Sequence, residues 1–91
     1  MGRLIIKVKI YTKEHCPACM MTKKLFNKLG VDYKEVTVLQ DSPMLEVLRK
    51  QGWHSFPVVE WLDEEGVGDA WSGFKPDNIK EVASYYGQSI D

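Results

Sequence analysis

Residues 4–29 read LIIKVKIYTKEHCPACMMTKKLFNKL, and this stretch decides the fold. Residues 4–11 alternate apolar and basic side chains and are rich in β-branched residues, which is typical of a β-strand. Lys7 and Lys9 are expected on the exposed face of this strand. The side chains expected on its buried face are those of Leu4, Ile6, Val8 and Ile10.

A helix is predicted to follow this strand after a short polar link. Pro17 suits the first turn of a helix, where its missing N–H costs nothing, and Gly30 suits the C-terminal cap. Lys23, Lys24 and Lys28 are expected to face solvent. The side chains expected along the buried stripe are those of Ala18, Met21, Thr22, Leu25, Phe26 and Leu29, which follow helical spacing.

The remaining elements are predicted from the same kinds of pattern. Residues 31–39 favour a second strand. Residues 41–43 offer a cap followed by a first-turn proline, so a second helix is expected from there to Gly52. Residues 57–62 and 67–71 flank a polar turn and predict a hairpin. Asp77 is expected to cap a last helix, whose buried stripe would be Ile79, Val82, Ala83 and Tyr86.

The predicted order of elements is β-α-β-α-β-β-α. A β-α-β unit requires a parallel pair of strands with a crossover, whereas the later hairpin adds antiparallel strands. We therefore expect an α/β fold with a four-stranded mixed sheet flanked by three helices. Residues 1–91 are expected to form a single domain, because the chain is too short for two and contains no linker.

The composition is that of an ordinary globular protein. Of the 91 residues, 44% are hydrophobic and 27% charged, and the net charge is −1. Because nucleic-acid-binding domains are usually strongly basic, these values argue against nucleic acid as a partner. Residues 1–34 carry a charge balance of +6 and residues 35–91 one of −7. This asymmetry is either ordinary solvated surface or a basic field around residues 12–24.

The apolar residues near the N-terminus do not form a targeting signal. Lys7 and Lys9 interrupt them, so neither a signal peptide nor a membrane-spanning helix is predicted. We expect no membrane association and a cytoplasmic location. Cytoplasmic thiols are kept reduced, so a close cysteine pair there is more often catalytic or metal-binding than structural.

The two cysteines form a Cys-x-x-Cys motif where the first strand meets the first helix. Cys16 is expected at the helix N-terminus, where free N–H groups and the helix dipole favour a thiolate. Since the thiolate is the attacking species in disulfide exchange, Cys16 is the expected nucleophile and the more buried Cys19 the resolving thiol. Lys13 and His15 are expected either to favour the thiolate further or to be solvated loop residues.

Two other interpretations of the cysteine pair stay open at this point. A zinc site would need His15 and His54 as its other ligands, although no spacing brings His54 near the motif. The pair could also be inert core. A Cys-x-x-Cys beside a β-α-β pattern nevertheless favours a thioredoxin-like redox site.

Pro57 supports the redox interpretation independently. It starts what is expected to be an inner strand, where a missing N–H must be accommodated by unusual geometry. A cis Phe56-Pro57 bond would provide that geometry and leave the Phe56 backbone free to pair with an extended segment of a partner. The alternative is an ordinary trans proline at the end of a strand.

Several segments together resemble the NrdH-type redoxins, glutaredoxin-like members of the thioredoxin superfamily. The resemblance covers nearly the whole chain, and its most specific part is WSGFKPD at residues 71–77. The other matching segments are IYTK at 10–13, the cysteine motif at 16–19, TKK at 22–24 and FPVV at 56–59.

This resemblance implies a thioredoxin-like fold and a monomeric thiol-disulfide oxidoreductase. Its redox group would be the Cys16–Cys19 disulfide, with no bound cofactor or metal. The implied reductant is thioredoxin reductase, with NADPH as the indirect electron source. The implied substrate is a class Ib ribonucleotide reductase or another disulfide-bearing protein.

The resemblance also assigns roles around the dithiol. Four residues would support it, namely Tyr11, Lys13, Pro17 and Ala18. The residues that would bind a partner are Phe56, Pro57, Val58, Trp71, Ser72, Gly73 and Phe74. Trp71 and Phe74 could alternatively belong to the core.

Three other functions remain as alternatives. A glutathione-dependent glutaredoxin typically carries two consecutive glycines before an Asp, whereas here Phe74 follows Gly73. A small metal-delivery domain would require a strand where residues 43–51 predict a helix. A redox-inert binding domain on the same scaffold is the last alternative.

Overall fold

The computed structural model describes residues 4–86. The strands are β1 (Ile5–Thr12), β2 (Lys34–Thr37), β3 (Val58–Asp63) and β4 (Gly68–Ser72). The helices are α1 (Pro17–Lys28), α2 (Pro43–Lys50) and α3 (Pro76–Tyr85). The predicted order β-α-β-α-β-β-α is confirmed. No helix within this part of the chain has the length and apolar character needed to cross a membrane.

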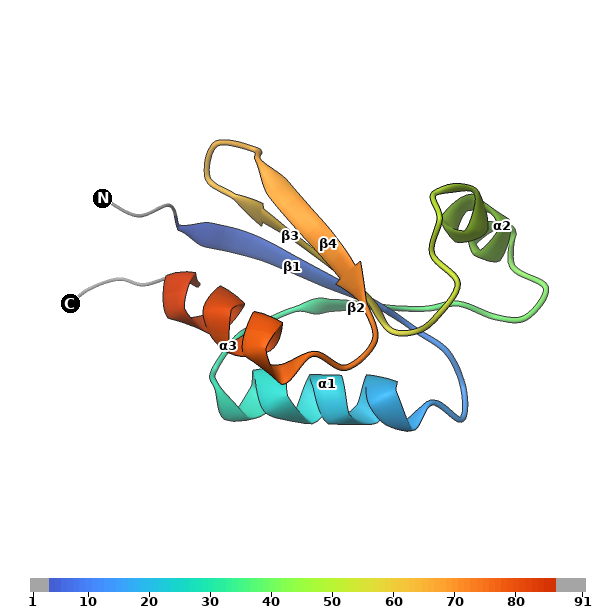
Figure 1. Ribbon diagram of the computed structural model, residues 1–91, viewed down its shortest axis with the longest axis horizontal. Helices are drawn as coiled ribbons and strands as arrows, with labels where there is room; N and C mark the ends of the chain where they lie inside the picture. The colour runs from blue at the N-terminus through green and yellow to red at the C-terminus, as the bar shows by residue number, and fades with distance from the viewer. Residues whose placement is uncertain (1–3, 87–91) are drawn as a thin grey trace.

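The four strands form one mixed sheet in the order β2-β1-β3-β4. β1 and β2 run parallel and are connected through α1, whereas β3 is antiparallel to both β1 and β4. α1 and α3 lie side by side on one face of this sheet, while α2 lies on the other side near one end (Figure 1). The expected four-stranded mixed sheet with three flanking helices is therefore confirmed.

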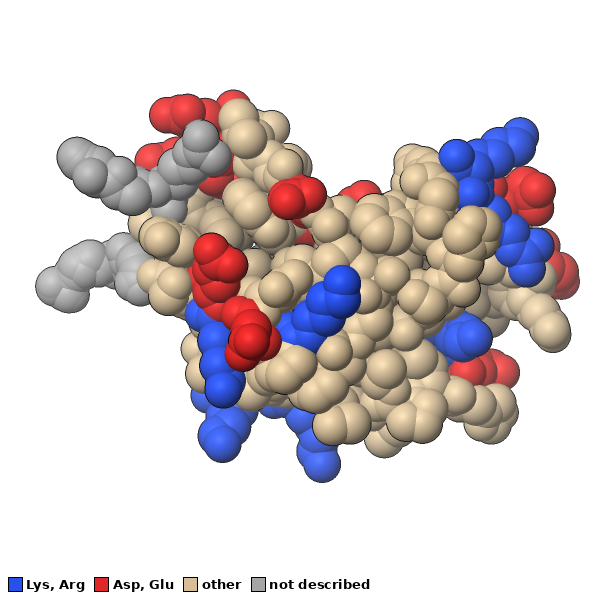
Figure 2. Space-filling model, viewed as in Figure 1, with Lys and Arg blue, Asp and Glu red and all other residues tan. Residues whose placement is uncertain are grey.

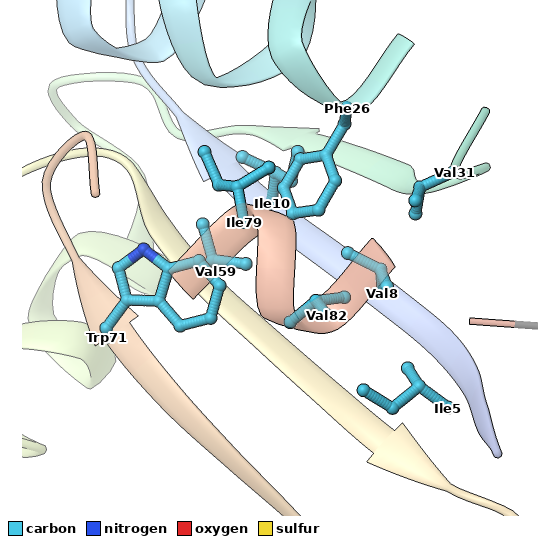
Figure 3. Close-up of a cluster of buried hydrophobic side chains, with 9 residues drawn as sticks. All are labelled: Ile5, Val8, Ile10, Phe26, Val31, Val59, Trp71, Ile79 and Val82. Atoms are coloured by element: carbon cyan, nitrogen blue, oxygen red, sulfur yellow. The ribbon is translucent and has the colours of Figure 1, made fainter. Parts of the chain in front are cut away.

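The main core fills the space between the sheet and the pair α1 and α3. Figure 3 shows its side chains converging from these elements. The buried members of this core are Ile5, Val8, Ile10, Phe26, Val31, Val59, Trp71, Ile79 and Val82. Ile79 and Val82 confirm the stripe expected for α3.

A smaller core lies under α2. Its buried members are Tyr11, Val38, Leu48 and Val58. Ser42 caps α2, because its hydroxyl oxygen accepts a hydrogen bond from the Met44 N–H at 3.1 Å. Pro43 then occupies the first turn, as the sequence predicts.

The prediction for the buried face of β1 is wrong at Ile6. Ile5 is buried, whereas Ile6 is 50% exposed. The pairing of β1 with β3 shifts register between Ile5 and Lys7, which inserts one extra residue. A bulge of this kind reverses the alternation beyond it, so Ile5 takes the inward place that simple period-2 spacing gives to Ile6.

Two further details differ from the sequence prediction. In α1, Met21 and Leu29 are exposed, because the buried stripe runs instead through Cys19, Thr22 and Phe26. In α3, Lys75 rather than Asp77 is the N-cap residue, since Pro76 already occupies the first turn. Asp77 lies inside that first turn, where its negative charge still faces the positive end of the helix dipole.

Candidate functional site

Cys16 and Cys19 lie at the junction of β1 and α1, and a disulfide joins them. Cys16 is the N-cap residue of α1, and Pro17 occupies the first helical turn. The two Cα atoms are 5.2 Å apart, a separation within the usual range for a disulfide. The loop before the helix turns at His15, which has a φ of 55°, a left-handed conformation that His adopts more readily than most residues.

The helix N-terminus presents a hydrogen-bond donor directly to one of the sulfurs. The backbone N–H of Cys19 donates to the Sγ of Cys16 at 3.1 Å. Cys16 is 7% exposed and Cys19 is 2% exposed. A sulfur in the N-cap position is therefore stabilised as a thiolate by this N–H and by the helix dipole, while its partner is less accessible from outside.

Four residues were expected to support the dithiol, and they occupy different environments. Pro17 is exposed and Ala18 is partly buried. Tyr11 is buried in the small core under α2. The ammonium group of Lys13 lies 5.5 Å from the centre of the Phe56 ring, so Lys13 forms a cation–π contact with a residue of the expected partner surface.

The Phe56-Pro57 peptide bond is cis, as the sequence interpretation favours. Pro57 and Val58 are buried, and Phe56 is partly buried. The carbonyl of Pro57 accepts a hydrogen bond from the Gly73 N–H at 2.8 Å. Within residues 4–86, neither the N–H nor the C=O of Phe56 has a hydrogen-bond partner.

The segment after β4 is tied to the proline segment. Val58 pairs with Ser72 in the sheet, and the Ser55 hydroxyl donates to the Ser72 hydroxyl oxygen at 2.9 Å. Gly73 has a φ of 89°, a conformation that glycine adopts without steric cost. The structure thus brings Phe56, Pro57, Val58, Ser72 and Gly73 together.

Trp71 lies in the main core and is 7% exposed. Phe74 is partly buried and packs against the same cluster. Within the described residues, the buried indole Nε1 of Trp71 has no hydrogen-bond partner. Both aromatic residues therefore contribute to packing, and little of Trp71 is accessible to a partner.

Sequence reasoning missed a polar network beside the site. The Thr12 hydroxyl donates to the Glu35 carboxylate at 2.8 Å, and the Lys23 ammonium lies 2.9 Å from the same oxygen. These hydrogen bonds, first from Lys23 and then from Thr12, hold the pKa of Glu35 below its usual value of 4.5. The network joins β1, α1 and β2, and no local sequence signal indicates it.

Sequence reasoning also missed a groove of about 500 Å³ that is lined in part by the three residues before Cys16. Four segments line it: the loop before Cys16, the loop between β2 and α2, α2 itself, and residues 53–56. The basic side chains in its lining are Lys13, His15, Arg49 and His54, and we call it the basic groove. The residues come from distant parts of the chain, so only the fold reveals it.

His15 and His54 both line the basic groove, although no spacing in the sequence predicts that they lie together. Among residues 4–86, however, no group of three or more His, Cys, Asp or Glu side chains could hold a metal ion. The Cys16–Cys19 disulfide is a group at this site that can exchange electrons.

Comparisons with known proteins agree with this geometry. The glutaredoxin family model matches residues 8–67. The "Glutaredoxin-like protein NrdH" of Escherichia coli K12 is 35% identical over 85% of this chain and 89% of its own length. Its counterpart in Lactococcus lactis MG1363 is 26% identical over 84% of this chain and 99% of its own length.

Solved structures give the same result. The glutaredoxin-like protein NrdH-redoxin of Escherichia coli has a TM-score of 0.69 at 36% identity, over 84% of this chain and 93% of that one. The thioredoxin-like protein BC3987 has a TM-score of 0.64 at 23% identity, over 84% and 99% of the two chains, and this supports the fold alone. The fold is thus thioredoxin-like, and the chain belongs to the glutaredoxin family, among its NrdH-type thiol-disulfide oxidoreductases.

Proposed function

We propose that this protein is a dithiol electron carrier that reduces disulfides in other proteins, with Cys16 as nucleophile and Cys19 as resolving thiol. The single observation that carries the proposal is the N-cap position of Cys16, whose sulfur accepts the Cys19 N–H. That arrangement favours negative charge on the sulfur of Cys16. The lower exposure of Cys19 suits a thiol that reacts second.

The proposed reaction has two exchange steps. The Cys16 thiolate attacks one sulfur of the partner disulfide, forming a mixed disulfide and releasing the other partner sulfur as a thiolate. The Cys19 thiolate then attacks the sulfur of Cys16. This second step forms the Cys16–Cys19 disulfide and releases the partner with both sulfurs reduced, so the carrier loses the two electrons that the partner gains.

The cis-proline segment is proposed to align the partner. Phe56 has an unpaired backbone N–H and C=O within the described residues, and it precedes the buried Pro57 and Val58. An extended partner segment could form main-chain hydrogen bonds there, as in β-strand addition. Ser72, Gly73 and Phe74 would border the same surface, with Trp71 supporting it from within.

We further propose thioredoxin reductase, supplied by NADPH, as the reductant, and a class Ib ribonucleotide reductase as the substrate. The support is membership among the NrdH-type redoxins and the "thioredoxin-like activity profile" attributed to the similar Escherichia coli NrdH-redoxin. Residues 1–91 would act as a cytoplasmic, monomeric single domain. Its redox group would be the Cys16–Cys19 pair, which accounts for both cysteines of the chain.

A coupled assay tests the proposed function. NADPH oxidation is followed with the oxidised protein, thioredoxin reductase and a disulfide-bearing protein as terminal electron acceptor, and in parallel with glutathione and glutathione reductase in place of thioredoxin reductase. We expect turnover in the first system and little in the second, with both lost in Cys16→Ser. Fast turnover with glutathione and none with thioredoxin reductase would instead identify a glutathione-dependent glutaredoxin.

A further inference from the structure

The basic groove opens beside the dithiol. Lys13, Glu14 and His15, which line one wall, directly precede Cys16 in the chain. Phe56, which lines another part, directly precedes Pro57. A partner segment aligned along Phe56 would therefore continue into this groove, whose volume of about 500 Å³ is in the range of ligand-binding clefts.

Among the residues that the structure describes, the cations of the groove form no ion pair with the protein. Within residues 4–86, neither Lys13 nor Arg49 forms an ion pair, although Lys23 is paired with Glu35. Glu14 is the one acidic side chain among the described residues that line the groove. Figure 2 shows Lys and Arg side chains over α2 at the right-hand end of the molecule, with acidic side chains beside them, while further acidic side chains gather over the β3–β4 hairpin at the upper left.

The groove combines this charge with an apolar lining. Leu39, which is 53% exposed, and the partly buried Trp53 contribute to it. The Lys13 ammonium lies 5.5 Å from the centre of the Phe56 ring, and within residues 4–86 the backbone N–H and C=O of Phe56 have no hydrogen-bond partner. The chemistry favours a peptide segment with carboxylates and aliphatic carbons. The net charge of −1 and the acidic hairpin argue against a nucleic acid.

We propose that the basic groove selects partner segments that carry acidic side chains next to the target cysteine. This proposal rests on the proposed function, because it concerns which disulfides the dithiol reduces. Lys13 and Arg49 would attract the partner carboxylates, and Leu39 and Trp53 would contact the apolar parts of the same segment. Electrostatic complementarity of this kind raises association rates and makes them dependent on salt.

Single-turnover reduction of synthetic peptides tests this selection. The peptides share one internal disulfide, have blocked termini, and carry flanking Glu, Gln or Lys residues. Pre-reduced protein, freed of reductant, is mixed with each peptide, quenched with acid and analysed by mass spectrometry. We expect the Glu peptide to react about tenfold faster than the Gln peptide at low salt, the Lys peptide to be slowest, and the differences to shrink in about 0.5 M salt.

Two charge variants on the same helix provide the matched comparison. Arg49→Gln should lower the ratio of Glu-peptide to Gln-peptide rates about threefold, the size expected for one partly exposed ion pair. Lys50→Gln, which removes a charge on α2 outside the groove lining, should leave that ratio unchanged. Equal rates for the Glu and Gln peptides, or an equal loss of the ratio in both variants, would overturn the proposal.

Two further measurements distinguish a failure of the groove proposal from a failure of the proposed function. A Gln peptide with a free C-terminal carboxylate should not react appreciably faster than the blocked Gln peptide. Acceleration by this terminal carboxylate alone would overturn selection of acidic side chains. Neutral hydroxyethyl disulfide tests the dithiol itself. Failure to reduce either hydroxyethyl disulfide or any of the peptides would overturn the proposed function. Normal reduction of hydroxyethyl disulfide, with equal rates for the peptides, would overturn the groove proposal alone.

Discussion

The two faces of the sheet are packed differently. One face carries the larger buried core, and the other borders the groove that is proposed to recognise partner proteins. On the face covered by α1 and α3, nine buried side chains from residues 4–86 form the main core, and α1 holds Cys16 at its N-terminus. On the other face, α2 covers a core to which the same described residues contribute four buried side chains, and it borders the basic groove. The well-packed layer of α1 and α3 thus positions the dithiol, while the smaller layer under α2 leaves an open groove near it.

The largest expected effect comes from removing one buried aliphatic side chain from each core. Ile79 of the main core is 0% exposed and Leu48 under α2 is 2% exposed. We expect Ile79→Ala to lower the free energy of unfolding by about 4 kcal/mol and Leu48→Ala by about 2–3 kcal/mol, because the cost depends on how far the surroundings can collapse. Urea titration of both variants measures the difference. An equal or larger loss in Leu48→Ala would show that the layer under α2 is packed at least as well as the main core.

A smaller effect on stability is expected from the N-caps of α2 and α3. Ser42 caps α2 through its hydroxyl oxygen, whereas Lys75 at the start of α3 makes no side-chain cap bond within the described residues. Ser42→Ala should therefore lower the free energy of unfolding by about 1 kcal/mol, and Lys75→Ala should change it little. The same urea titrations measure both. A loss confined to Lys75→Ala would contradict this assignment of caps.

The smallest expected effect concerns the link between α1 and the sheet. The Lys23 and Thr12 hydrogen bonds lower the pKa of Glu35 in the folded state. The resulting stabilisation is therefore fully present above the pKa of the unfolded chain and is lost as the pH falls through the lower folded-state pKa. Since the Lys23 and Glu35 side chains are 30% and 33% exposed, solvent screens the pair and we expect about 0.5 kcal/mol.

Glu35→Gln measures this contribution through the pH dependence of stability. The difference in the free energy of unfolding between the native protein and the variant should be present at about pH 7 and should shrink as the pH falls below the usual Glu pKa of 4.5. Glu81→Gln, at an exposed position of α3, serves as the control. A difference that does not change with pH would show that the charge of Glu35 contributes nothing.

The sequence predicts the order of elements because strand alternation, proline positions and caps are local signals. Ser42 and Pro43 mark the start of α2, and Ile79 and Val82 lie on the buried stripe of α3, as expected. The prediction fails at Ile6, since a bulge depends on pairing with β3 rather than on β1 itself. It also fails at Asp77, because Pro76 moves the start of the helix by two residues.

The candidate site can be predicted only in part from the sequence, because some of its residues are brought together only by the fold. Cys16 and Cys19 are adjacent in one motif, and both the motif and its place before a helix are visible in the chain. Arg49 and Lys13 reach the same groove from segments more than 30 residues apart, so their proximity exists only in the fold. No pattern within α2 distinguishes Arg49 from an ordinary solvated residue.

Trapping the mixed disulfide tests the central claim most directly. Cys19→Ser and Cys16→Ser proteins are each incubated with a disulfide-bearing protein substrate, and covalent complexes are measured by non-reducing electrophoresis and mass spectrometry. Attack by the N-cap sulfur predicts that Cys19→Ser accumulates a complex through Cys16, while Cys16→Ser forms almost none. Accumulation of a complex through Cys19 in Cys16→Ser, with none in Cys19→Ser, would contradict the account.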